Sequence, residues 1–149
     1  MKRERSKWLA LSLGVMLLGA GPVLAEDAAP LMREAPADAE VYFLEPADHA
    51  VVPPSFKVVF GLRNMGVAPA GTDRPNTGHH HLLIDSPEGL DFTQPLPATD
   101  QVRHFGGGQT EAVIELPPGK HTLQLVMGNF VHIPHATPVV SNTITVTVE

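Results

Sequence analysis

The residues of this chain best suited to chemistry are its histidines, and three of them are consecutive, in the segment His79–His81. Imidazole binds copper, zinc, nickel and iron well, and it is also the side chain that titrates near neutral pH. The spacing of the histidines predicts one histidine-rich site, provided that the fold brings separate segments together. The complete set is His49, His79, His80, His81, His104, His121, His132 and His135.

The triple histidine opens a segment that continues into the apolar run 82–84, which is typical of a buried strand. Side chains alternate between the two faces of a strand, so His79 and His81 share one face and His80 lies on the other. The face that carries His80 is the more apolar one, so we expect His80 to point toward the core. His79 and His81 are then the pair available to chelate one ion.

Three further histidines flank two predicted strands, 110–116 and 121–127, at positions that share one end of the domain. A tight turn with the sequence PPGK joins these strands, so the start of the first and the end of the second lie together. His104 precedes the first strand, and His132 and His135 follow the second. We therefore expect these three imidazoles to converge.

The long segment 86–109, rich in Pro and Gly, decides whether the triple histidine joins them. Loops of this length are uncommon in compact domains and are often functional, and a crossover of this kind is usual in Greek-key topologies. The sequence thus predicts a single metal site. Imidazoles more than roughly 10 Å apart would exclude it, because metal–nitrogen bonds are about 2 Å long. The predicted ligands are His79, His81, His104, His132 and His135.

The available ligand types favour copper over zinc. The chain has no cysteine, whereas closed structural zinc sites usually contain thiolates. Nitrogen ligands, with a thioether from Met65 or Met127 as a further candidate, suit copper. A histidine-brace oxygenase would need histidine at the mature N-terminus, where we expect Glu26, and no nucleophile motif or carboxylate pair stands out. We therefore predict no catalytic residues and a binding protein rather than an enzyme.

The N-terminus predicts export. A basic stretch, an apolar run and small residues before Glu26 are typical of a signal peptide spanning residues 1–25, although a membrane anchor is the alternative reading. Cleavage would remove four basic residues and one acidic residue, so the formal net charge changes from −6 to −9. We expect a periplasmic or secreted protein without a membrane anchor. Such an acidic chain is unsuited to nucleic acid or anionic membranes.

The rest of the chain predicts one domain. Residues 26–39 indicate a flexible acidic lead-in, and residues 40–149 indicate an all-β, immunoglobulin-like sandwich of about six or seven strands, because short alternating segments are separated by Pro and Gly and no amphipathic helix is evident. The turn at 117–120 predicts a β-hairpin. The main strand segments are 41–46, 55–65, 79–85, 110–116, 121–127 and 139–149.

Four motifs in combination, TGHHHLLID, QPLPATDQVRHFGGGQTEA, LPPGKHTLQLVMGN and HIPH, carry a family resemblance. From about Glu40 to Glu149 the chain resembles bacterial exported proteins catalogued as domain of unknown function 4399. The resemblance implies an exported domain in which the three histidine motifs occur together. It implies no agreed activity.

Two other functions remain open at this level. The protein could be a cell-envelope interaction module whose histidines are structural, the role we expect for His49 and His121. It could also bind a small molecule or glycan through residues 86–109, although one Tyr and six Phe make a poor glycan platform. The expected partners are a metal ion and, as a candidate, another periplasmic protein. Protonation of the clustered imidazoles near pH 6.5 should lower thermal stability toward pH 5 (approximate values).

Overall fold

The computed structural model describes residues 31–149, which form strands, turns and loops without a helix. The expected signal peptide, residues 1–25, and the first part of the expected lead-in lie outside the described residues. Within residues 31–149 there is accordingly no helix that could cross a membrane.

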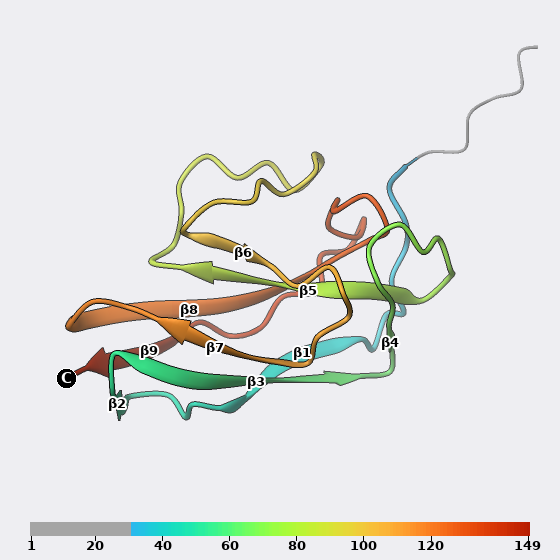
Figure 1. The fold of residues 1–149 in the computed structure, drawn as a ribbon. Coiled ribbons are helices and arrows are strands. Elements are labelled where there is room, and N and C mark those ends of the chain that lie inside the picture. The colour runs from blue at the N-terminus through green and yellow to red at the C-terminus, as the bar shows by residue number, and fades with distance from the viewer. Residues whose placement is uncertain (1–30) are drawn as a thin grey trace, which may run out of the picture.

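Two β-sheets pack face to face (Figure 1). The smaller sheet has the order β1-β3-β7, and the larger has the order β2-β9-β8-β5-β4, with β6 also paired to β5. The predicted all-β, immunoglobulin-like sandwich is confirmed, with nine strands in the described chain where about six or seven were expected. The strands are β1 (Glu40–Glu45), β2 (Ala50–Val52), β3 (Ser55–Arg63), β4 (Gly66–Val67), β5 (Thr77–Ile84), β6 (Val102–His104), β7 (Glu111–Glu115), β8 (Gly119–Gly128) and β9 (Ile144–Val148).

The strands that the sequence pattern missed are the short ones, β2, β4 and β6. Each has three residues or fewer, which is too short for alternation to be visible. Each forms because a longer strand offers it an edge: β2 pairs with β9, and β4 and β6 pair with β5. Their existence therefore depends on long-range pairing.

The predicted hairpin between β7 and β8 is wrong. β7 pairs with β3 in the smaller sheet, whereas β8 pairs with β5 and β9 in the larger one. The turn 117–120 instead carries the chain from one sheet to the other, because the apolar residues of both strands pack across the core rather than side by side. A tight turn fixes a reversal of direction but does not choose the neighbour. The start of β7 and the end of β8 still share one end of the sandwich.

The main core lies between the sheets and is built from inward-facing residues of alternating strands. In β3 and β7 these include Phe56, Val58 and Ile114, and in β8 they include Leu123 and Leu125. Removing this apolar surface from water is the dominant favourable contribution to folding. A chain without disulfides depends on it.

A second, smaller core covers the outer face of the larger sheet. Leu83 of β5, Val102 of β6 and Val126 of β8 pack there against Leu96 from the long loop before β6. In Figure 1 this loop rises above β5 and β6 and returns along them. Consequently β5 is buried on both faces over almost its whole length, which is unusual for a strand in an antiparallel sheet and places its histidines out of solvent.

Residues 31–39, here called the N-terminal strap, lie against the domain. Arg33 forms an ion pair with Asp73 at 2.7 Å, and the side-chain amide of Asn129 donates a hydrogen bond to the carbonyl of Leu31 at 2.8 Å. These residues belong to the segment expected to be a flexible lead-in. The boundary placed at residue 40 stays a prediction, but contacts with the domain begin before it.

Candidate metal centre

Four histidines from three segments converge on the outer face of the larger sheet, near one end of the sandwich. His79, His81, His104 and His132 each offer one nitrogen, and these four nitrogens all lie within 4.8 Å of one another. Their ring centroids are separated by 4.6 to 6.1 Å, well inside the limit set above for a shared ion. These four side chains are called the histidine group below.

Strand β5 supplies two members of the group and directs their neighbour away. His80 packs on the inner face against Phe60 of β3, with ring centroids 5.0 Å apart. Alternation along the strand then places His79 and His81 on the outer face, with their ring centroids 4.8 Å apart. The structure thus agrees with the predicted division of the triple histidine.

Strand β6 supplies His104. It runs antiparallel to β5 with His104 directly opposite His81, and the two ring centroids lie 5.1 Å apart. The sequence placed His104 correctly beside the pair but for a different reason, the proximity of β7. The sequence pattern that could have revealed β6 is the alternation of Val102 and His104 with Arg103. Three residues are too few for this alternation to stand out.

The loop after β8 supplies His132, and one buried side chain shapes that loop. The side-chain oxygen of Asn129 accepts hydrogen bonds from the backbone N–H groups of Val131 and Ile133, at 3.0 and 3.2 Å. Within this tight turn His132 has φ of 69°, a conformation uncommon for a residue with a side chain. The strap holds the same Asn129 through Leu31, so the turn is fixed from both sides.

The contact between His79 and His132 has the spacing of two ligands. Nε2 of His79 lies 3.1 Å from Nδ1 of His132. In a tetrahedral site with metal–nitrogen bonds of about 2.0 to 2.1 Å, two ligand nitrogens are roughly 3.3 Å apart. The pair can therefore share a proton in the free protein or face one ion with little movement.

Two glycines make room for the imidazoles. Gly128 lies opposite His79 on β8, and a Cβ atom there would be 2.5 Å from Cε1 of His81. A Cβ atom on Gly106 would likewise overlap the ring of His104. Both glycines therefore have a steric role at the group.

Burial keeps the two inner imidazoles neutral. His79 and His81 are both fully buried, and Nδ1 of His79 and both ring nitrogens of His81 have no hydrogen-bond partner within residues 31–149. Burial, and then the neighbouring imidazoles, lower the pKa of His79 to about 4 and that of His81 to about 3. At neutral pH these rings are uncharged, so their lone pairs are free to bind a metal ion.

His135 lies beside the group but is not one of the four. It is buried, with a pKa lowered by that burial, and its Nε2 lies 3.3 Å from the carbonyl oxygen of Thr77 at the start of β5. A Cβ atom on Gly78 would be 3.1 Å from its ring. A role as a fifth ligand stays a prediction. The contacts present hold the loop after β8 against β5.

The two methionines considered as thioether ligands lie on the core side. Met127 is directly opposite His80 in the pairing of β5 and β8 and belongs to the main core, and Met65 packs against the same core. The histidine group is on the other face of the sheet. The structure thus brings nitrogen ligands together without either sulfur atom.

His49 and His121, which we expected to be structural, lie away from the group. His121 contacts two oxygens: its Nδ1 is 2.8 Å from a carboxylate oxygen of Asp85, and its Nε2 is 2.9 Å from the carbonyl of Pro117. Burial alone would lower the pKa of His121, but these hydrogen bonds raise it. His49 is exposed in a turn and lies 3.4 Å from Asp48.

Residues 58–149 match the family model described as domain of unknown function (DUF4399). The chain belongs to this family. No curated protein matches the chain. Among solved structures, an endo-beta-1,4-mannanase from Thermotoga petrophila is similar, with a TM-score of 0.44 and 16% sequence identity, covering 75% of this chain and 20% of the mannanase chain.

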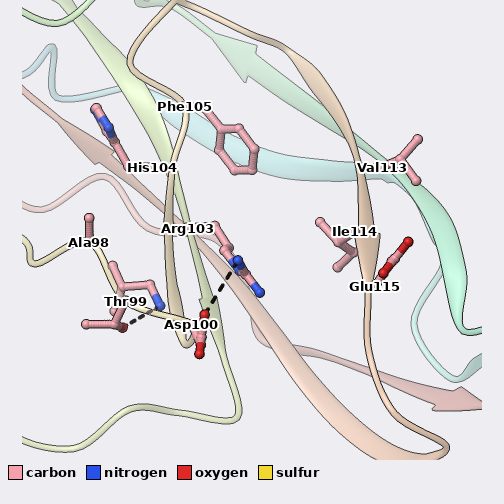
Figure 2. A pocket seen from close by; sticks show the side chains of 10 residues that line it. Ala98, Thr99, Asp100, Arg103, His104, Phe105, Val113, Ile114 and Glu115 are labelled. Atoms are coloured by element: carbon pink, nitrogen blue, oxygen red, sulfur yellow. Dashed lines mark hydrogen bonds and ion pairs between the residues drawn. The ribbon is translucent and has the colours of Figure 1, made fainter.

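An open cleft of about 1030 Å³ lies between β6 and β7, next to the histidine group (Figure 2). Arg103 points into it and forms a long ion pair of 3.9 Å with the exposed Asp100. The side chain of His104 points away from Val113 on the other wall, toward the far side of β6. His104 lines the cleft and also belongs to the histidine group, so the two adjoin at this residue.

Replacing Gly128 by Ala should disturb the histidine group from its inner wall. The added methyl group would overlap the ring of His81, which is fully buried. We expect a loss of about 1–3 kcal/mol in the free energy of unfolding, measured by urea denaturation. Gly107→Ala is the matched control, because its Cβ would meet only the exposed side chain of Gln109. Equal stability of the two variants would contradict the packing.

Acidification should destabilise the metal-free DUF4399 protein. The pKa values of His79, His80 and His81 are about 4, 4 and 3 in the folded protein, against an ordinary value of 6.5. Between these limits the unfolded chain binds more protons than the folded one, so the free energy of unfolding falls as the pH is lowered. The decline should begin near pH 6.5 and continue to about pH 4, and thermal melting at stepped pH values measures it.

Two variants separate this effect from general acid unfolding. His80→Leu removes one buried imidazole from the inner face, so its stability profile should be less steep over the same pH range. His49→Asn changes an exposed histidine at a positive φ that Asn tolerates, so its profile should match that of the unmodified protein. Identical slopes for His80→Leu and the unmodified protein would rule out the proposed linkage.

Proposed function

We propose that this protein is a periplasmic metal-binding protein, and that the ion is copper held by the histidine group for carriage or buffering. The observation that carries the proposal is the convergence of four nitrogens within 4.8 Å, two of the imidazoles being fully buried. His79 and His81 would form the inner half of the site. His104, which is exposed, and His132, which is half-buried, would form the outer half.

The hydrogen-bonding state of the histidines favours a ligand role over a structural one. Buried polar groups in native proteins are nearly always hydrogen-bonded. His121 follows that rule with a carboxylate and a carbonyl as partners, whereas His81 has no partner for either nitrogen within the described residues. A bound ion would occupy such a lone pair and offset the loss of hydration. The interaction-module reading leaves the nitrogens of His81 unexplained, and neither reading accounts for those of His80, which also have no partner within the described residues.

The chemistry of the ligand set supports copper. A cluster of imidazoles without thiolates is a borderline donor set, and copper binds such sites more tightly than the other divalent first-row ions do. The partial exposure of His104 leaves one side of the group open for ligand exchange, which suits a protein that releases its cargo. The basic and apolar N-terminus supports export, and the acidic mature chain would attract cations.

Metal titration of the purified protein tests this function. We expect sub-micromolar binding of copper, followed by competition with a chromophoric chelator, and a loss of affinity of at least about 100-fold in the double variant His79→Ala plus His81→Ala. His49→Asn should bind as the unmodified protein does, since it lies outside the group. Weak binding of every ion tested, or unchanged affinity in the double variant, would contradict the proposal.

A further inference from the structure

The ligand set of the histidine group is electrically neutral. Within residues 31–149 all four members of the group are histidines. No Asp or Glu carboxylate in this part of the chain lies close enough to join them as a ligand. The neighbouring charges that act on His79 and His81 are likewise those of other imidazoles. This neutrality is unexpected in a chain whose expected mature form is strongly acidic.

The surroundings of the group offer little else to neutralise an ion. Beside it on the same face of the sheet, Leu83, Val102 and Val126 form the small apolar core. Metal-binding histidines usually donate their second ring N–H to a carboxylate or carbonyl, but Nδ1 of His79 and both nitrogens of His81 have no such partner in the described part of the chain. Glu34 acts electrostatically on the neighbouring His135, but no carboxylate among the described residues belongs to the group, so no ligand would offset the charge of a bound ion.

In such a site, the charge of the ion affects how tightly the histidine group binds it. The cost of moving an ion from water into a medium of low dielectric constant grows with the square of its charge. The attraction between an ion and neutral dipolar ligands grows only in proportion to that charge. Thiolates supply the compensating charge in many structural zinc sites, and a site of three neutral histidines holds zinc together with a water or hydroxide at an open position. A buried site without anionic ligands penalises a divalent ion relative to a monovalent one.

On the basis of the proposed metal-binding function, we infer that the histidine group selects a monovalent, polarisable cation, Cu(I) or its redox-inert analogue Ag(I), over divalent ions. The inner pair His79 and His81 provides the neutral, water-excluded half of the site. A divalent ion at the same place would need an accompanying anion such as hydroxide, for which the exposed side at His104 is the available position.

Selectivity of the unmodified protein is the first test. Under anaerobic conditions we expect Cu(I) and Ag(I) to bind at least about 100-fold more tightly than Zn(II) or Cu(II), as measured by competition with chelators of known affinity. Zn(II) or Cu(II) binding as tightly as Cu(I) would overturn the inference while leaving the metal-binding function intact. Failure of every ion to bind would instead overturn the proposed function itself.

A matched pair of substitutions tests whether charge is the cause. His104→Glu places a carboxylate at the accessible side of the group, and His104→Gln has nearly the same shape without the charge. For each ion, the affinity of the His104→Glu variant is divided by that of the His104→Gln variant. This ratio should be at least about 10-fold larger for Zn(II) than for Ag(I), because a divalent ion interacts twice as strongly with the added charge. Equal ratios for both ions would overturn the inference.

The reduction potential of bound copper gives an independent readout. Selective stabilisation of Cu(I) raises the potential, so bound copper in the His104→Gln variant should be easier to reduce than in His104→Glu. Electrochemistry of the two copper-loaded variants measures the difference directly. A higher potential in His104→Glu would overturn the charge argument, because the carboxylate should favour Cu(II).

Discussion

The burial of three consecutive imidazoles on one central strand constrains much of this structure. Adjacent side chains on β5 point to opposite faces, so no single layer of protein can cover all three. The smaller sheet covers His80 on one face, where Phe60 packs near its ring. On the other face His79 and His81 are fully buried, and His132 from the loop after β8 packs against both. A strand with both faces buried thus requires a third layer over what would otherwise be an ordinary two-layer sandwich.

That third layer is held together by backbone hydrogen bonds between loops that are distant in the sequence. The amide of Leu96 donates to the carbonyl of His132, and the amide of Gly71 donates to the carbonyl of Phe130. The N-terminal strap contributes Arg33, which lies over the ring of Phe130 as well as pairing with an acidic residue. These contacts explain how a loop residue such as His132 can be positioned as firmly as one on a strand.

Electrostatics act on two scales in this molecule. The acidic composition of the expected mature chain produces a field that attracts cations from a distance. At the histidine group itself, neutral nitrogens replace that negative charge. Under the proposed function, neutral ligands would hold an ion without retaining every cation that reaches the surface, and apolar neighbours such as Leu83 would strengthen the discrimination by excluding water.

The sequence by itself determined the fold class and the division of the triple histidine, because alternation along a strand is a local property, and its four motifs identified the family. It also pointed to His104 and His132 as neighbours of that pair. Only the tertiary structure decided that β7 and β8 lie in different sheets, that β6 exists, and that Gly128 makes room for His81. The reason is physical: short strands, steric gaps and the choice of pairing partner are set by residues far away in the chain, so no local pattern records them.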